Sequence, residues 1–326
     1  MHSYGKKGLK ALLQAMKPLS LRAVSLILRN NFTRLLLNQS YEHLGAKYND
    51  AFNICFHNPR LANYFIWNVS FGKKTFKVPV LPSLPRSWDN ARVWKWSGNR
   101  LIRPFYEWYL DENPTGVYFD IGANDGMHTF AFAVHGYTCV SFEPQPSCID
   151  YIRQVCDLNE FKNVTIMQTA VSNEDGRDVE FYVSESSWYS SFYKDHVEQL
   201  EKSTAITAIN VNTITVDAFC ERKGIRPTFI KIDTEGAEWK VLQGAQNILE
   251  QERPDLFIEV DAAEFGKQKI WRMLSGLDYH CYYLPYTFPR EAAKLFSPVD
   301  SLEAFLATGG TQGNANFIFL ANKIRI

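Results

Sequence analysis

Acidic residues and glycines meet in the segment VYFDIGANDGMHTF, which spans residues 117–130. Asp120 closes an apolar run, and Gly122, Asn124 and Gly126 follow in a short turn before a stretch with helical spacing. Glycines at a strand-to-helix turn let backbone N–H groups approach a ligand, and the start of a helix favours negative charge. The segment therefore predicts a nucleotide-binding loop.

Other structures for this turn fit less well. A hairpin turn is disfavoured because a helix, not a strand, follows. A calcium-binding EF-hand loop aligned on Asp125 and Gly126 would require oxygen ligands at Ile121 and Ala123. The dinucleotide fingerprint G-x-G-x-x-G is absent, because Asn124 stands where its middle glycine would be. A pyrophosphate cradle is therefore not expected, which disfavours a nicotinamide-dependent oxidoreductase.

Glu143 is a second acid, at the distance from the glycine loop that is typical of a ribose-binding carboxylate. It lies 21 residues after Gly122, at the end of the next apolar run and directly before Pro144. A carboxylate in that place can accept hydrogen bonds from both ribose hydroxyls of an adenosine. The alternative is an ordinary loop in which Glu143 is solvated. The spacing favours the nucleoside site.

Carboxylates end four of the expected strands, and these are Asp120, Glu143, Asp233 and Glu259. A single acid in such a place is explained as a cap for the helix that follows. In open α/β sheets, however, ligands bind at the carboxyl ends of the strands. Four acids at converging strand ends therefore point to one shared site.

Three motifs carry a specific resemblance to a known family. The motifs FDIGANDGMHT, FEPQPSC and IKIDTEGAEWKVLQGA occur in this order and resemble the FkbM family of methyltransferases. The resemblance covers about residues 117–285. It implies an α/β fold with the Rossmann-like sheet of class I, S-adenosylmethionine-dependent methyltransferases, mostly parallel and seven-stranded.

The same resemblance implies roles for individual residues. Gly122, Asn124 and Gly126 would line the methionine end of S-adenosylmethionine, and Glu143 would hold its ribose. The remaining cofactor-binding candidates are Asp120, at the end of the strand, and Ala170, in a run that would lie beside the adenine. Members of the family methylate hydroxyls of sugars, glycans and natural products, so the resemblance implies O-methylation.

Methyl transfer to a hydroxyl needs a group that takes up the proton, because an alcohol is a poor nucleophile. The candidate catalytic residues are Asp233, Glu235, Glu259 and His196. Lys231 and Asp233 lie two apart on one strand and therefore share a face. A partly buried ion pair that supports the site is thus the alternative role for Asp233.

A divalent cation such as Mg²⁺ is an alternative to a protein base. Asp233, Glu259 and Asp261 offer carboxylate oxygens at two strand ends, which suit a hard cation that orients the hydroxyl and lowers its pKa. Residues 184–204 form an insertion rich in aromatic residues and serines, a composition that suits a sugar ring. This insertion predicts a substrate-facing lid; the alternative is that its aromatic side chains pack on the core.

The elements that must position these residues alternate regularly from residue 117 onwards. Strands are expected at 117–120, 137–143, 164–171, 179–183, 228–233, 256–260, 279–284 and 316–320. Helices are expected at 127–135, 148–159, 237–250 and 264–274, and 211–223 should hold a short strand and a helix. Apolar strands that alternate with helices predict a parallel sheet covered on both faces.

The chain is expected to divide near residue 100. Residues 1–100 are assigned to a mainly helical N-terminal extension, in which a basic amphipathic helix precedes an aromatic-rich segment. Residues 101–326 are assigned to the S-adenosylmethionine-binding methyltransferase domain. Residues 1–41 contain seven basic residues and no acid, although the net charge of the whole chain is 0. Peripheral contact of residues 6–37 with an anionic membrane is one interpretation; a helix docked on the acidic remainder, or an oligomer contact, is the other.

Composition limits the compartment and the partners. No apolar run approaches the roughly 20 residues that span a bilayer, and the first residues lack the core of a signal peptide. A transit peptide is a minor alternative, against which Pro18 and the long continuation argue. The six cysteines form no C-x-x-C pair, which is typical of reduced thiols. A cytoplasmic protein is therefore expected, with membrane association through residues 6–37 as the option, and the charge balance does not mark a nucleic-acid binder.

Together these features predict an S-adenosylmethionine-dependent O-methyltransferase that acts on a hydroxyl of a sugar, a glycan or a related metabolite. The alternative is a non-catalytic glycan-binding or scaffolding protein on the same fold. The four residues Gly122, Gly126, Glu143 and Asp233 are all present, which argues against a degenerate site.

Overall fold

The computed structural model describes residues 65–80, 102–184, 189–200, 206–260, 266–284, 297–307 and 315–322. The chain divides into two compact units, one of residues 1–69 and 77–98 and the other of residues 70–76 and 99–326. The basic helix expected within residues 6–37 lies outside the described residues.

A β-hairpin forms within the segment that the sequence assigned to a mainly helical extension. Strand β1 (Phe65–Phe71) and strand β2 (Lys74–Val80) pair as a separate two-stranded sheet. Along the hairpin, buried Val69, Phe71, Phe76 and Val78 alternate with exposed residues, which is the period of a strand. Gly72, at φ +53°, supplies the turn.

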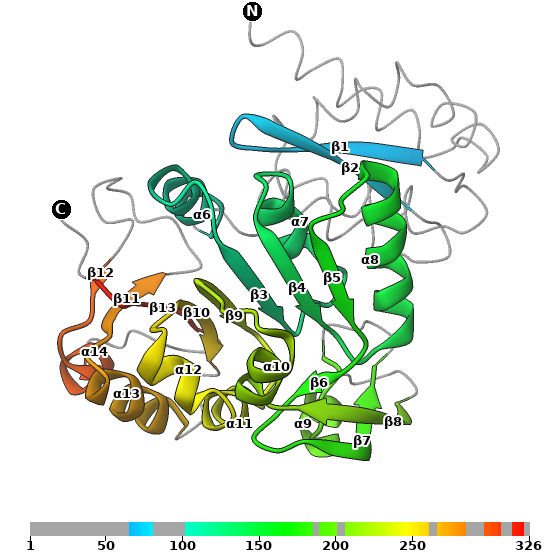
Figure 1. The fold of residues 1–326 in the computed structure, drawn as a ribbon. Helices are drawn as coiled ribbons and strands as arrows, with labels where there is room; N and C mark the ends of the chain where they lie inside the picture. Colours follow the sequence, from blue (N-terminus) through cyan, green and yellow to red (C-terminus); the bar gives the residue numbers. More distant parts are fainter. Residues whose placement is uncertain are drawn as a thin grey trace, which may run out of the picture. The chain divides into compact units, whose positions relative to one another are not determined.

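The expected mostly parallel, seven-stranded sheet is confirmed (Figure 1). Its parallel strands are β3 (Val117–Ile121), β4 (Thr138–Phe142), β5 (Val164–Met167), β9 (Phe229–Ile232) and β10 (Asp255–Val260). Strand β13 (Ala315–Leu320) runs antiparallel between β10 and β11 (His280–Leu284). The two-residue strand β12 (Ser297–Pro298) adds an eighth strand at the edge, so the order is β12-β11-β13-β10-β9-β3-β4-β5.

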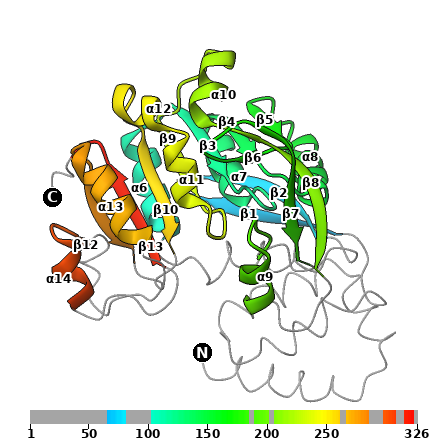
Figure 2. The ribbon, with the colours of Figure 1, turned by 90° about the horizontal axis from the view of Figure 1, so that it is seen from below.

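Helices cover both faces of this sheet, as the apolar strands predicted (Figures 1 and 2). One face carries α6 (Ile102–Glu112), α7 (Met127–Ala133) and α8 (Pro146–Asn159). The other carries α10 (Val216–Lys223), α11 (Glu238–Gln243), α12 (Gln246–Gln251) and α13 (Gly266–Gly276). On the first face, Tyr106 of α6 and Phe132 of α7 pack on Phe229 of β9. On the second, residues of α10 to α13 join one buried apolar cluster with the strands.

The strand expected at 164–171 is two strands in two different sheets, so that prediction was wrong. After β5 the N–H of Thr169 bonds to the oxygen of Met167 at 2.9 Å, and this tight turn redirects the chain. Strand β6 (Ala170–Val171) then joins β7 (Gly176–Val183) and β8 (Thr207–Ile214) in a three-stranded sheet of order β6-β8-β7. Helix α9 (Lys194–Leu200) lies in the insertion between β7 and β8.

The single helix expected at 237–250 is likewise divided, into α11 and α12. Gly244 separates them, and a Cβ there would lie 2.2 Å from the backbone oxygen of Ser172. The close approach of another segment interrupts the helix, although the apolar spacing continues through it. Helix α14 (Leu302–Ala307), late in the chain, was not expected.

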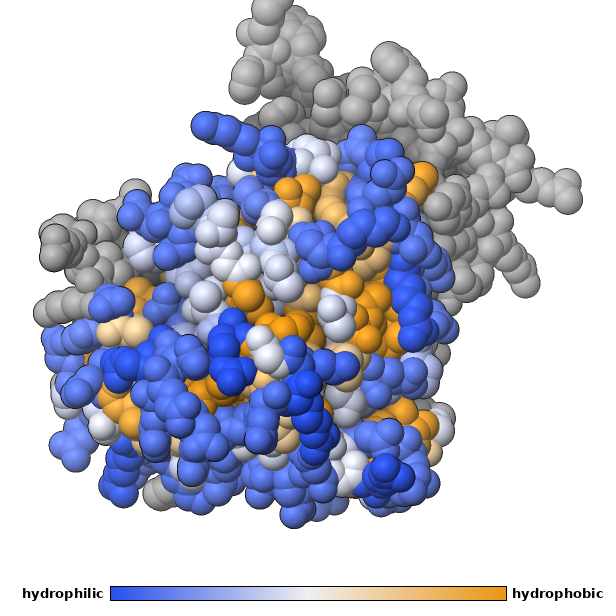
Figure 3. Space-filling model, in the orientation of Figure 1, coloured by the Kyte–Doolittle hydropathy of each residue, from blue (hydrophilic) through white to orange (hydrophobic). Residues whose placement is uncertain are grey.

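The surface of the described residues is largely hydrophilic. Figure 3 shows one face, on which smaller hydrophobic areas are enclosed by polar ones. Among the described residues, Ile66 and Tyr193 are the large hydrophobic side chains that stay exposed. No helix within this part of the chain is long and apolar enough to span a bilayer. The five cysteines that the structure describes are free thiols, and all are buried.

Candidate functional site

Strand register brings several predicted residues together at the carboxyl ends of β3, β9 and β10. Asp120 of β3 lies opposite Lys231 of β9, and two residues further along both strands Gly122 lies beside Asp233. Strand β10 pairs with β9 in a register that places Glu259 next to Asp233, on the side opposite to Gly122. Neighbouring strands are about 4.8 Å apart. Gly122, Asp233 and Glu259 therefore form one row across three strand ends.

The loop after β3 needs glycine at two of the predicted positions. Gly122 has φ +73° and Gly126 has φ +74°, which glycine adopts most easily. A Cβ at Gly122 would lie only 1.8 Å from the backbone oxygen of Asp233. Asn124, between them, is also left-handed at φ 49°. The loop therefore lies directly against the end of β9, and backbone groups rather than side chains form its surface there.

Glu143 joins this loop to the end of β4. Its side chain is buried, with 6% of the residue exposed. Oε2 accepts the N–H of Asn124 at 2.8 Å, and Oε1 accepts the N–H of Gln145 at 2.9 Å. Burial raises the pKa of Glu143 to about 7, although these two N–H groups act in the opposite direction. Each carboxylate oxygen can accept a further hydrogen bond, so Glu143 can serve both the loop and a ligand.

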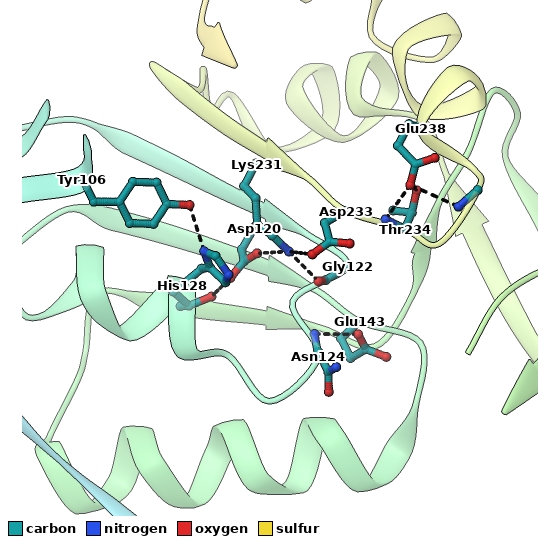
Figure 4. Close-up of polar contacts among 12 residues, drawn as sticks. Tyr106, Asp120, Gly122, Asn124, His128, Glu143, Lys231, Asp233, Thr234 and Glu238 are labelled. Atoms are coloured by element: carbon teal, nitrogen blue, oxygen red, sulfur yellow. Dashed lines mark hydrogen bonds and ion pairs between the residues drawn. The ribbon is translucent and has the colours of Figure 1, made fainter. Parts of the chain in front are cut away.

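Lys231 is the centre of a buried group of charges (Figure 4). Its Nζ lies 2.9 Å from the backbone oxygen of Gly122, 3.2 Å from Oδ2 of Asp233 and 3.5 Å from Oδ1 of Asp120. Burial alone would lower the pKa of Lys231, but Asp233 and Asp120 outweigh it and the net pKa is raised. The ammonium group therefore stays charged. The ion pair between Lys231 and Asp233, which the sequence offered as the alternative role of Asp233, is present.

Asp120 and Asp233 differ in how far they reach the surface. The side chain of Asp120 is 0% exposed and that of Asp233 is 26% exposed. Asp120 also accepts the hydroxyl of Thr129 at 2.6 Å, and burial raises its pKa against the opposing effects of Lys231 and Thr129. Asp120 thus holds Lys231 from inside the protein, whereas Asp233 presents a carboxylate to the open end of the sheet.

Two further catalytic candidates, Glu235 and His196, lie together. Oε2 of Glu235, on the loop after β9, is 3.5 Å from Nε2 of His196, on α9. The Ser191 hydroxyl donates to the backbone oxygen of Glu235 at 2.8 Å. Burial raises the pKa of Glu235 to about 7, and His196 acts against that increase. The insertion is therefore attached to the loop that follows Asp233.

Glu238 fixes the conformation of that loop (Figure 4). Its Oε1 accepts the N–H of Thr234 at 2.8 Å, the Thr234 hydroxyl at 2.9 Å and the N–H of Gly236 at 3.2 Å. Because Glu238 is itself buried in the first turn of α11, these bonds hold the loop against the helix. Asp233 and Glu235 are thereby carried on a rigid turn.

The sequence left two roles open for the aromatic residues of the insertion, a substrate-facing lid and packing on the core, and the structure shows one residue in each kind of environment. Phe192 packs edge-on against Phe181 of β7, with 5.3 Å between ring centres. Tyr193 is 40% exposed, and its ring lies next to Gly236 and 5.3 Å from Nζ of Lys240. Trp188 lies outside the described residues. The Phe192 ring, which is partly buried, therefore packs against the three-stranded sheet, and the Tyr193 ring remains available at the surface.

The remaining candidates lie at the margins of the site. Ala170 is buried in β6 among apolar side chains of the three-stranded sheet. Asp261, the third carboxylate of the predicted Mg²⁺ site, lies outside the described residues. Within the described part of the chain, no three His, Cys, Asp or Glu residues are grouped so that they could hold a metal ion. The roles assigned to individual residues stay predictions.

Two further polar groups lie on the α6 and α7 side of the sheet. His128 is partly buried, and its Nδ1 lies 2.8 Å from the Tyr106 hydroxyl; burial lowers its pKa well below the usual value. Asn316 of β13 lies opposite Glu259. Sequence reasoning missed Asn316. In the sequence it is a single amide at the start of an apolar strand, and its place beside Glu259 is known only once the strand pairing is known.

Comparisons with solved structures give methyltransferases. The methyltransferase FkbM from Methylobacillus flagellatus is 16% identical, with a TM-score of 0.40, over 63% of this chain and 44% of that one. A SAM-dependent methyltransferase from Agrobacterium tumefaciens is 8% identical, with a TM-score of 0.43, over 80% of this chain and 72% of that one. TYW2 from M. jannaschii, in complex with AdoMet, is 11% identical, with a TM-score of 0.39, over 79% and 86%. The present chain thus spans less than half the length of the first of these proteins.

The family described as "Methyltransferase FkbM domain" matches residues 120–282, which is half of the chain. No curated protein matches the chain. The matched segment begins at Asp120 and includes the glycine loop, Glu143, Asp233 and Glu259. The chain therefore belongs to the FkbM family of S-adenosylmethionine-dependent methyltransferases.

Proposed function

We propose that the protein transfers a methyl group from S-adenosylmethionine to a hydroxyl of a sugar, a glycan or a related metabolite. The observation that carries the proposal is the position of Asp233. Its partly exposed carboxylate is held by the buried ammonium of Lys231, directly beside the loop that begins at Gly122. A proton acceptor thus adjoins the loop in which the family binds its cofactor.

The residues at the ends of β3 and β4 suit this cofactor. A Cβ at Gly122 would fill the space against β9, so glycine leaves backbone groups to face the methionine portion. Glu143 already accepts one N–H on each oxygen and retains acceptor capacity for the two ribose hydroxyls. Ala170 starts the strand beside which the adenine would lie. When bound, S-adenosylmethionine supplies an electrophilic methyl group on a sulfonium centre.

Asp233 is the proposed base of the reaction. In this role Asp233 would take up the proton of the acceptor hydroxyl, and bound S-adenosylmethionine would supply the methyl group. Lys231 holds the carboxylate of Asp233 in place, and Glu238 holds the loop that follows it. The insertion, attached through Ser191 and His196 to Glu235, would close over the acceptor and exclude water.

The test is the Asp233→Asn variant, which keeps the shape of the side chain and removes its charge. Titration calorimetry should give a nearly unchanged Kd for S-adenosylhomocysteine. Turnover should fall roughly 100-fold or more, which is the range for loss of a general base. The assay incubates a panel of methyl glycosides and oligosaccharides with labelled S-adenosylmethionine and detects methylated products by mass spectrometry. The control is Asp150→Asn, because the Asp150 side chain is 67% exposed and is paired with Arg153 on the surface of α8.

Each contradicting outcome has a separate meaning. Failure to bind S-adenosylhomocysteine would refute the proposed function. Binding without methylation of any compound would favour the glycan-binding or scaffolding alternative. Near-normal turnover in Asp233→Asn would transfer the role of base to Glu259 or His196. Loss of activity on addition of a chelator would show that a divalent cation takes part.

A further inference from the structure

Asn316 carries a buried polar atom that makes no hydrogen bond within the described part of the chain. It is the second residue of β13 and is 2% exposed. Its Oδ1 has no hydrogen-bond partner among the residues that the structure describes. Buried amide oxygens are almost always satisfied in native proteins, because desolvation without a replacement bond is unfavourable. The orphaned oxygen therefore needs an explanation.

The position of Asn316 extends the row of strand ends to a fourth strand. Asn316 lies directly opposite Glu259 in the antiparallel pair of β13 and β10, and such opposed residues share a face. Because β13 runs in reverse, its start lies at the carboxyl ends of β9 and β10 (Figures 1 and 2). Two strand spacings put the backbone of Asn316 about 10 Å from that of Asp233.

A structural role does not account for this side chain. Phe317, Ile318 and Phe319, which follow it in β13, are buried and apolar. Asn163, in contrast, is an asparagine with a clear structural role, because its Nδ2 donates to the backbone oxygens of Ala133 and Tyr137 at 2.9 and 2.7 Å. Among the residues that the structure describes, no equivalent bond fixes the amide oxygen of Asn316, and an apolar residue would fit the strand better.

We propose that Asn316 binds a hydroxyl of the acceptor. This inference rests on the proposed function and adds to it a residue that binds the acceptor. Oδ1 of Asn316 accepts the O–H of one hydroxyl, while Asp233 receives the proton of another, with Glu259 between them. Asn316 and Asp233 lie on strands separated by β10, and hydrogen-bond acceptors spaced in this way suit a ring that carries several hydroxyls. The acceptor is therefore a polyhydroxylated ring such as a pyranoside rather than a molecule with one isolated hydroxyl.

The first test measures stability without any ligand. Asn316→Leu removes the unsatisfied amide at similar size, so its melting temperature should equal or exceed that of the wild type. Asn163→Leu is the control, and its melting temperature should fall because two backbone oxygens lose their donor. Asn316→Ala is a second variant that introduces no branched side chain. If both Asn316 variants are destabilised as much as the control, Asn316 is structural and the inference is wrong.

The second test measures binding of methyl β-D-glucopyranoside by saturation-transfer NMR, with the protein saturated with S-adenosylhomocysteine. The wild type should bind the glycoside, and Asn316→Leu and Asn316→Ala should bind it at least about tenfold more weakly, the effect of one lost hydrogen bond. The Kd for S-adenosylhomocysteine should not change in either variant.

Two results of the binding test would overturn the inference. The variants could bind the glycoside as well as the wild type does, or the wild type could fail to bind it. Failure of the wild type to bind S-adenosylhomocysteine would instead refute the proposed function, so the two proposals fail separately.

Discussion

Replacing Lys231 with methionine tests whether the buried ammonium holds the site together. The variant leaves the carboxylate of Asp120, which is 0% exposed, without its opposite charge. It also removes the donor to the backbone oxygen of Gly122. Removal of one partner from a buried ion pair costs about 3–5 kcal/mol. We expect the free energy of unfolding of Lys231→Met to fall by that amount, measured by urea denaturation at pH 8.

The double variant Asp120→Asn/Lys231→Met separates the charge from the hydrogen bond. Both charges are absent, so the main remaining loss is the donor to Gly122, which contributes about 1 kcal/mol. The double variant should therefore be more stable than Lys231→Met alone. A double-mutant cycle, completed by Asp120→Asn, should give a coupling free energy of about 2–3 kcal/mol.

The pH dependence of the stability of Lys231→Met is a second, independent test of this role. Burial already raises the pKa of Asp120, and loss of Lys231 removes the largest opposing effect, so the folded-state pKa rises further. The unfolded chain releases this proton near pH 4, whereas the folded variant retains it to higher pH. The deficit of Lys231→Met should consequently be small near pH 4 and grow as the pH rises. A loss under about 1 kcal/mol at pH 8, or a deficit independent of pH, would refute the reasoning.

Two further predictions concern the cofactor loop. Gly122→Ala adds about 1–2 kcal/mol of backbone strain and a further 1–3 kcal/mol of overpacking against Asp233, and it should abolish binding of S-adenosylhomocysteine. The control is Gly224→Ala, at φ +65° with nothing within 4 Å of the new Cβ, which should lose only the strain energy in urea denaturation. Equal losses of unfolding free energy in the two variants would contradict the contact between Gly122 and Asp233. Burial raises the pKa of Glu143 to about 7 in the free protein. Below that pH its carboxylate is protonated and accepts fewer hydrogen bonds. The Kd for S-adenosylhomocysteine should therefore rise up to about tenfold for each pH unit below 7. Glu143→Gln should bind more weakly with a flat profile, and a flat profile in the wild type would remove Glu143 from the ribose site.

Much of the fold and part of the site follow from local patterns in the sequence. Apolar runs of strand length between helical stretches predicted the parallel sheet, because periodicity reflects which side of one element is buried. The turn chemistry of Gly122 to Gly126 predicted a special loop, and both glycines do have positive φ. Acids at the ends of apolar runs predicted where a site would form, since parallel strands share one carboxyl edge.

Contacts between distant segments were decided only by the tertiary structure. Lys231 and Asp120 meet because β9 and β3 lie side by side in one register, and Asn316 meets Glu259 because the late strand β13 returns antiparallel to β10. The break at Gly244 likewise depends on the approach of Ser172. Periodicity in a sequence records the burial of each residue but not its partner, because strand order and register are set by how all the elements pack at once. The sequence by itself therefore determined which residue types stand at the strand ends, and only the folded sheet determined which of them touch.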